Sequence, residues 1–144
     1  MKEEGLRLER DYVCKDNYYE LLPDGIYKAV CYTFDKAFIV KSRKLFLKFE
    51  IIEPGEFFKK RIFYAFNMPY NNKISPGSKY YKEWISVNGL KPPSRNTIMS
   101  PKIFLNKAYR IKTRTVKPKK QNGKLMPETF NYTVVDSIVE VLTG

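Results

Sequence analysis

Hydrophobic and polar positions alternate through much of this chain, and the alternation is clearest in residues 44–53, "KLFLKFEIIE". Every second side chain there is apolar, whereas the opposite face is mostly charged, which is the period of a β-strand with one buried face. The apolar set is Leu45, Leu47, Phe49 and Ile51. Pro54 and Gly55 then supply a tight turn. The segment "KKRIFYAFN" at 59–67 follows and predicts a strand antiparallel to the first.

Three further segments predict strands. Residues 25–35, "GIYKAVCYTFD", are aromatic and β-branched, but neither alternation face is polar. That pattern is typical of a long curved strand whose two halves serve different sheets. "AYRIKTRTV" at 108–116 and "FNYTVVDSIVEVL" at 130–142 predict the last two strands, joined by a long polar hairpin loop around Asn122 and Gly123.

The middle of the chain, from Met68 to Lys107, predicts helix and loop. Ser75 and Ser78 are candidate N-caps, and Asn88 with Gly89 is a typical helix stop. The predicted packed face of the helix consists of Tyr81, Trp84, Ile85 and Val87. A second, short helical turn is expected where Ser100 precedes Pro101 at the first helical position.

The order is therefore three strands, a helix-bearing connection and a final hairpin. This mainly β order predicts a five-stranded Greek-key barrel like the OB-fold, with a helix between strands 3 and 4. An SH3-like barrel and an open sheet with one helix are the alternatives. Residues 1–22 are mixed in charge and are interpreted as an N-terminal extension, and residues 23–144 as one nucleic-acid-binding domain.

Charge changes this picture, because the formal net charge of +12 is unevenly spread. Residues 1–24 hold seven acids and four bases, a net of −3, so the remainder carries +15. From Trp84 to Pro127 there are eleven Lys or Arg and no Asp or Glu. A compositional bias toward Lys would not exclude acids from 44 consecutive residues, so a polyanionic partner is the better explanation.

The residue types in the chain argue against enzymatic and metal-binding functions. The chain has no His, which removes the commonest general base, and no Gly-rich phosphate loop. Its acids show no catalytic pairing or metal-site spacing, and Cys14 and Cys31 are expected to be free thiols. We therefore expect no enzyme activity and no cofactor or metal. With no membrane-length apolar run and no signal peptide, the protein is expected to be soluble and cytoplasmic.

The candidate binding residues combine aromatic side chains with Lys and Arg. They lie in the strand 1–2 loop, expected at residues 35–44, on the outer faces of strands 2, 3 and 4, and in the strand 4–5 loop. Bases of a single strand stack on aromatic rings while cations contact phosphates. The set is Phe38, Arg43, Lys44, Phe46, Lys48, Arg61, Phe63, Arg110, Lys112, Arg114, Lys117, Lys119 and Lys120.

Structural explanations compete with each assignment. Phe46 and Phe63 would instead be packing residues if the helix around Trp84 or the N-terminal extension covered them. The row Arg110, Lys112 and Arg114 places like charges on one strand face, and protection of a sheet edge is its strongest alternative. Tyr64, Phe66 and Trp84 are expected in the core, and any single lysine of the 4–5 loop is explained equally well by solvation.

The opening of the domain, "LPDGIYKAV" followed by "KLFLKFEIIEPGEFFKKRIF", resembles small OB-fold single-stranded DNA-binding proteins of phages and other mobile elements. The likeness covers residues 22–66, with Lys60 and Arg61 where those proteins have Gly-Arg. It implies the same fold and class, and a role in replication, recombination or transfer, with protein partners of those processes. It transfers no individual binding residue.

The leading hypothesis is thus a non-enzymatic, sequence-tolerant single-stranded DNA-binding protein. RNA is an alternative ligand, and a protein-interaction module of a replication or transfer complex is an alternative function. A small metal-dependent nuclease is the least supported. We further hypothesise that the acidic extension lies over the binding face as an electrostatic competitor.

Overall fold

The computed structural model describes residues 20–39, 42–94 and 97–142. Its elements follow the chain as β1 (Ile26–Ile39), β2 (Ser42–Ile51), β3 (Arg61–Met68), α1 (Lys79–Val87), η2 (Pro101–Phe104), β4 (Ala108–Val116), η3 (Glu128–Phe130) and β5 (Tyr132–Val141), where η marks a 3₁₀ helix. The predicted mainly β fold, with five strands and a helix between the third and fourth, is confirmed. Cys14 and most of the predicted N-terminal extension lie outside the described residues.

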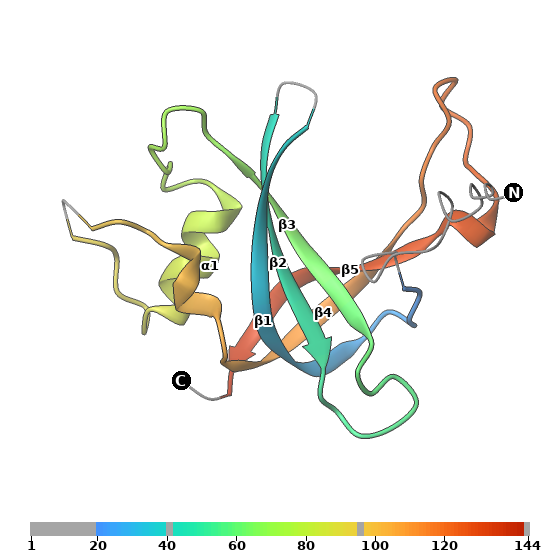
Figure 1. The fold of residues 1–144 in the computed structure, drawn as a ribbon, viewed down its shortest axis with the longest axis horizontal. Helices are drawn as coiled ribbons and strands as arrows, with labels where there is room; N and C mark the ends of the chain where they lie inside the picture. The colour runs from blue at the N-terminus through green and yellow to red at the C-terminus, as the bar shows by residue number, and fades with distance from the viewer. Residues whose placement is uncertain (1–19, 40–41, 95–96, 143–144) are drawn as a thin grey trace, which may run out of the picture.

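The strands form one antiparallel sheet in the order β3-β2-β1-β4-β5 (Figure 1). The strands β3 and β5 are therefore the two edges, and they lie beside each other in space. Within the described residues no backbone ladder joins them, so the sheet is not closed into the predicted barrel. Side chains span the two edges instead of main-chain hydrogen bonds.

Helix α1 makes this connection through Glu83, a buried carboxylate. The hydroxyl of Tyr64 on β3 donates a hydrogen bond to Glu83 Oε2, and the backbone N–H of Ile138 on β5 donates to the same oxygen at 3.0 Å. Burial and the hydrogen bond to Glu83 both raise the pKa of Tyr64, which keeps its hydroxyl a donor. One side chain of α1 thereby fastens both unpaired edges of the sheet.

A β-bulge in β1 explains why its sequence shows no clean alternation. Cys31 pairs with Phe49 and Thr33 pairs with Lys48, so Tyr32 is the extra residue. The core-facing parity changes there, from Cys31 before the bulge to Phe34 after it. Residues 26–30 of this strand pair with β4 and residues 29–39 with β2. The predicted long strand is therefore confirmed, but its two halves pair with neighbours in one sheet and do not serve two different sheets.

The prediction of a loop over residues 35–44 is wrong. Cross-strand pairs continue from Asp35 with Phe46 to Ile39 with Ser42, so the segment is the outer part of a β-hairpin. The lysines and arginine of this segment indicated a loop, but they are compatible with a strand because both faces of the hairpin leave the core here. This outer part of the β1–β2 hairpin is called the hairpin end below.

The predicted helix is present, with Ser78 as its N-cap accepting from the Tyr81 N–H at 3.2 Å. It ends before Asn88, and Gly89 follows with a positive φ of 71°. Trp84 and Val87 of the predicted packed face are buried, whereas the predicted Tyr81 and Ile85 are half-buried. The buried set is Tyr80, Glu83, Trp84 and Val87.

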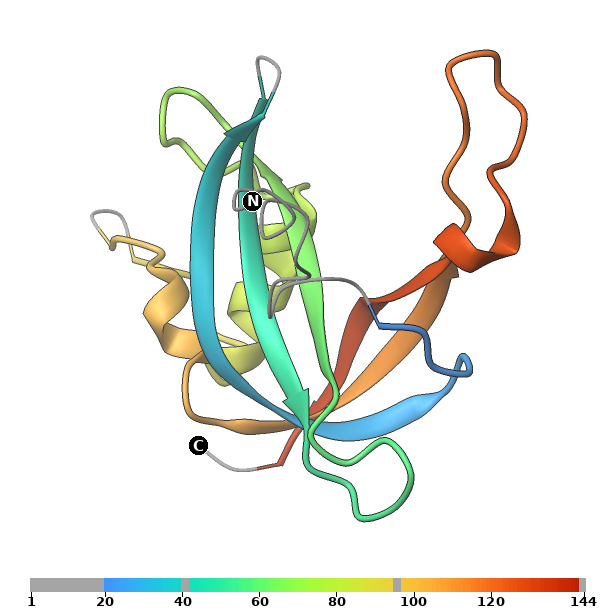
Figure 2. The ribbon, with the colours of Figure 1, turned by 45° about the vertical axis from the view of Figure 1, so that its right-hand side comes forward.

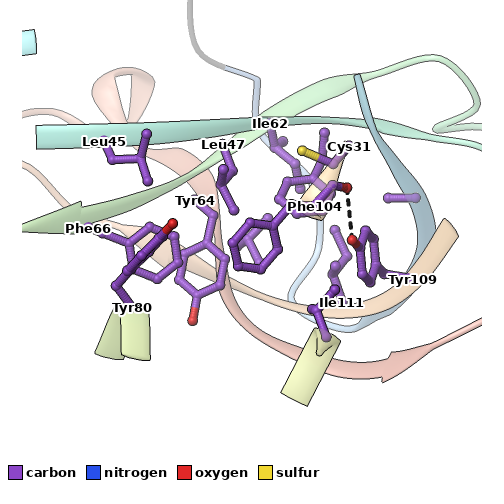
Figure 3. Close-up of a cluster of buried hydrophobic side chains, with 14 of the residues drawn as sticks. Cys31, Leu45, Leu47, Ile62, Tyr64, Phe66, Tyr80, Phe104, Tyr109 and Ile111 are labelled. Atoms are coloured by element: carbon purple, nitrogen blue, oxygen red, sulfur yellow. Dashed lines mark hydrogen bonds between the residues drawn. The ribbon is translucent and has the colours of Figure 1, made fainter. Parts of the chain in front are cut away.

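The core lies between the curved sheet and α1 with η2. Figure 3 shows Tyr64 and Phe66 of β3 directed at Tyr80 of α1, beside Leu45 and Leu47 of β2. The hydroxyl of Tyr109 donates to the carbonyl of Phe104 at 2.8 Å, and burial raises its pKa. The expected burial of Tyr64, Phe66 and Trp84 is confirmed.

The segment just before β1 belongs to this folded body. Leu22 is buried in the core, and its N–H donates to Thr133 Oγ1 at 2.7 Å. The Thr133 N–H in turn donates to the carbonyl of Glu20 at 2.8 Å. Residues 20–22 are thus fastened to the beginning of β5.

Candidate nucleic-acid interface

Three aromatic side chains on the outer face of the sheet form a continuous row across β2, β3 and β5. Phe46 and Phe63 are 5.4 Å apart between ring centroids in an edge-to-face arrangement, and Phe63 and Tyr132 are 6.2 Å apart at an interplanar angle of 31°. All three are half-buried. The row Phe46, Phe63 and Tyr132 is called the aromatic strip. It places two predicted residues, Phe46 and Phe63, next to each other.

Helix α1 lies on the other side of the sheet from the strip. Side chains alternate along a strand, so Phe63 points away from its neighbours Ile62 and Tyr64, which are buried in the core. Tyr64 contacts α1 through Glu83. The alternative that the helix around Trp84 covers Phe46 and Phe63 is therefore wrong. Coverage by the first 19 residues lies outside the described part of the chain.

The predicted cations of β2 and β3 border the strip, each with a polar partner. Lys44 donates to the side-chain oxygen of Asn67. Lys48 Nζ lies 2.6 Å from Asp35 Oδ2, and Arg61 Nε lies 3.1 Å from Glu50 Oε1. This face therefore presents rings with little net charge, and its cations are held in place by acids and an amide.

Arg61 also lies over the ring of Tyr32, with 4.7 Å between its guanidinium carbon and the ring centroid. Burial raises the pKa of Tyr32, and the positive charges of Arg61 and Lys48 oppose that rise. Tyr32 and Tyr132 are aromatic residues of this face that the sequence prediction missed. Three consecutive buried residues, Thr133 to Val135, follow Tyr132, so alternation did not assign its face, and the bulge concealed the orientation of Tyr32.

Two predicted residues lie at the hairpin end, away from the strip. Phe38 is exposed and contacts Tyr70, whereas Arg43 makes hydrogen bonds within the protein. Its Nη1 donates to the carbonyl of Tyr70 and to Asn72 Oδ1, both at 2.9 Å. Arg43 therefore fastens the hairpin to the segment after β3 through Nη1, and its predicted contact with phosphate stays a prediction.

The row Arg110, Lys112 and Arg114 occupies the outer face of β4. This strand lies between β1 and β5, so protection of a sheet edge does not explain the row. Two of its charges are paired with β5 carboxylates, Arg110 with Glu140 at 3.6 Å and Arg114 with Asp136 at 3.1 Å. Lys112 is exposed and pairs across the strands with Ser137. The row is thus largely neutralised by its neighbouring strand.

The loop between β4 and β5 is an arm, defined as residues 117–131. Its backbone folds back on itself, since Lys119 bridges to Leu125 and the Lys120 N–H donates to the Lys124 carbonyl at 2.7 Å. The turn falls at Gly123, whose φ is 84°, as predicted. Figures 1 and 2 both show the arm projecting well beyond the sheet.

The arm contributes charge that the strip lacks. Its exposed lysines are Lys117, Lys119, Lys120 and Lys124. Within the described residues none of these ammonium groups pairs with a carboxylate. Because β5 begins at Tyr132, the arm rises directly from the end of the strip, and it projects toward the same side as the hairpin end (Figure 2).

The described part of the chain brings no three acidic or cysteine side chains together at a spacing that could hold a metal ion. Cys31 is a buried free thiol, and burial raises its pKa to about 12. None of the described helices is long and apolar enough to cross a membrane. The chain matches no protein-family model and no curated protein sequence.

Proposed function

We propose that this protein binds single-stranded DNA without enzymatic action and with little sequence preference. The observation that carries the proposal is the aromatic strip, Phe46, Phe63 and Tyr132, on an outer sheet face from which a lysine-bearing arm rises. A single strand exposes base faces that stack on such rings, at about 1–3 kcal/mol per base. A duplex conceals those faces.

The sheet order supports an OB-fold-like architecture for this function. In the OB-fold, oligonucleotides bind across strands 2 and 3 and between the loops joining strands 1–2 and 4–5. Here Phe46 and Phe63 lie on β2 and β3, and the hairpin end and the arm are those two connections. We propose an open version of that barrel, in which α1 spans β3 and β5.

The aromatic strip and the arm contribute different parts of the binding energy in this proposal. On the strip, Lys48 and Arg61 already contact carboxylates, so stacking is the main contribution there. On the arm, lysines without a carboxylate partner among the described residues supply phosphate contacts and counterion release. Roles in replication, recombination or transfer of a mobile element rest on the sequence resemblance alone.

The test is a fluorescence-anisotropy titration of labelled oligo-dT at several salt concentrations, with duplex DNA and RNA as competitors. We expect salt-dependent binding that duplex DNA does not displace. If duplex DNA competes equally well, the surface binds polyanions in general and not single strands in particular. If RNA competes better than DNA, the ligand is RNA. No binding at low salt would overturn the proposal and favour a protein-interaction module.

A further inference from the structure

The hairpin end carries a second aromatic and basic surface, on the face opposite the strip. Phe38 pairs across the strands with Arg43, which has the same parity as the core residue Leu45. Since side chains alternate along a strand, both point to the inner face, away from Lys44 and Phe46. Beyond Leu45 this inner face has left the core and contacts the segment after β3.

Phe38 and Tyr70 form an exposed aromatic pair on this inner face. Their ring centroids are 6.0 Å apart at an interplanar angle of 60°, and the residues are 65% and 57% exposed. Two large rings that touch each other yet stay in water bury little of their apolar surface, so they contribute little to the core. Such a patch indicates a contact surface for a partner.

Arg43 keeps the pair in place. Its guanidinium donates to the carbonyls of Pro69 and Tyr70, at 3.3 and 2.9 Å, and to Asn72 Oδ1 at 2.9 Å. These bonds join the hairpin, which carries Phe38, to the backbone of Tyr70. The two rings are therefore preorganised, which lowers the entropy lost when a ligand binds them.

The two chain segments that carry the pair are basic. Residues 36–49 and 57–82 contain no Asp or Glu, and Lys36 and Lys73 are exposed. A hollow of about 300 Å³ is lined by residues that precede and follow Tyr70 in the chain, including Asn67, Pro69 and Lys73, but not by Tyr70 itself. This combination of exposed rings and exposed cations suits a polyanion that carries flat bases.

We propose that Phe38 and Tyr70, with Lys36 and Lys73, form a second nucleic-acid subsite, called the tip subsite. This inference rests on the proposed function and extends it. A strand bound on the aromatic strip continues over the hairpin end, and a later base stacks on the Phe38–Tyr70 pair while the lysines contact phosphates. Arg43 acts as a positioning residue that holds the two rings.

Length dependence tests the tip subsite, because only a longer strand reaches both surfaces. Affinity for oligo-dT is measured from about 4 to 16 nucleotides and beyond, the range occupied by single OB-folds. We expect Tyr70→Ala to leave short oligonucleotides unaffected and to weaken long ones roughly tenfold, the loss of one stacked base. Phe46→Ala should weaken binding at every length, and Tyr70→Phe, which keeps the ring, should resemble wild type.

The outcomes separate this inference from the proposed function. If wild-type protein binds no oligo-dT, the proposed function fails. If Phe46→Ala weakens binding but Tyr70→Ala matches wild type at every length, the strip stands and the tip subsite is overturned. Equal losses for Tyr70→Ala at short and long lengths would also overturn it, because the rings would then belong to one site.

A measurement on the unaltered protein covers the case in which Tyr70→Ala does not fold. A long oligonucleotide containing 5-iododeoxyuridine is crosslinked by light to wild-type protein, and the crosslinked peptides are identified by mass spectrometry. We expect crosslinks at Phe38 or Tyr70 in addition to those at the strip. Crosslinks confined to the strip would overturn the tip subsite.

Discussion

Phe46 is the residue on which the stacking proposal can be tested most directly. Its ring meets Phe63 on the outer face, and its neighbours Leu45 and Leu47 supply the core contacts of β2. We expect Phe46→Ala to weaken single-strand binding by about 1–3 kcal/mol while the salt dependence stays nearly unchanged, because no charge is removed. Anisotropy titrations at several salt concentrations give both quantities.

The matched control is Phe58→Ala, which removes an equally large exposed ring from the turn before β3. It should bind like wild type. If Phe46→Ala unfolds the protein in a thermal melt, the ring is a packing residue and the outer face has been misassigned.

A substitution at Asp35 should raise the affinity for single strands, whereas Phe46→Ala should lower it. Its carboxylate lies 2.6 Å from Lys48 Nζ, where a phosphate of a bound strand would compete with it. We expect Asp35→Asn to tighten single-strand binding and to steepen the salt slope by about 0.7, the contribution of one additional phosphate contact. The ion pair is partly solvent-exposed, so the free energy of unfolding should change by about 1 kcal/mol or less.

Glu56→Gln is the control for Asp35→Asn, because it raises the net charge equally at an exposed site away from the strip. An equal gain in both variants would show that only net charge matters. No gain in Asp35→Asn would mean that Lys48 does not meet a phosphate.

Single residues also show where a sequence pattern is insufficient. Arg43 lies among lysines and was predicted only as a phosphate contact, so its structural role was missed: its Nη1 donates to backbone carbonyls and to Asn72, about 26 to 29 residues later in the chain. Such acceptors leave no sequence signal, because every residue carries a carbonyl. Tyr32 was missed since a one-residue bulge reverses the parity on which the prediction depends.

At the scale of elements, α1 connects two strands that the main chain leaves unpaired. Glu83 accepts from Tyr64 on β3 and from Ile138 on β5, and it is only 8% exposed. Glu83→Ala would leave a buried hydroxyl and a part-buried N–H without this acceptor, at about 1–3 kcal/mol for the buried group and less for the other. We expect a loss of at least about 2 kcal/mol in unfolding free energy, measured by denaturant titration.

Glu83→Gln tests whether this effect is specific to the carboxylate. It keeps one acceptor oxygen and nearly the same volume, so its loss should be smaller than that of Glu83→Ala. Equal stability of Glu83→Ala and wild type would show that the two edges are held by packing alone.

The arm should govern the electrostatic part of binding. Lys119 and Lys120 are exposed and lie near its turn. We expect the double variant Lys119→Ala/Lys120→Ala to reduce the salt slope by about 1.4, that is, two phosphate contacts on a single strand. Lys82→Ala/Lys91→Ala removes two charges from α1 and the loop after it, and should leave the slope unchanged. Equal slopes in the two variants would contradict a specific role of the arm.

The strands themselves were largely predictable, because alternation records which face is buried. The positions of β2, β3, β4 and β5 followed from it, and so did the inner and outer residues of β2. The ion-pair partners of Arg110 and Arg114 on β4 were not predictable. Asp136 and Glu140 are visible as acids, but two register shifts between β4 and β5 decide which arginine each one meets.

At the scale of the whole molecule, the closure of the sheet was the part that sequence could not decide. A barrel and an open sheet need the same five strands in the same order. They differ only in whether β3 and β5 exchange main-chain hydrogen bonds, and every backbone can do so. A side chain of α1 joins the two edges instead, and its partners are distant in sequence.

The N-terminal extension supplies the last prediction. The described chain begins at Glu20, whose carbonyl accepts from Thr133, so the extension departs beside Tyr132 of the strip. The 19 preceding residues carry five acids and four bases, and in extended form they would reach about 60 Å, farther than the strip. If their carboxylates compete with phosphates, deletion of residues 1–19 should tighten single-strand binding at low salt, and high salt should abolish the difference.

This deletion ends at residue 19 because Leu22 is buried in the core, and a longer truncation would test stability instead of competition. The matched control exchanges the five acids of the extension for their amides, Glu3→Gln, Glu4→Gln, Glu9→Gln, Asp11→Asn and Asp16→Asn, and keeps its length. Competition by charge requires that the deletion and the exchange both tighten binding at low salt. A gain from the deletion alone would mean that the extension occupies space at the strip, and unchanged or weaker binding in both would remove the hypothesis.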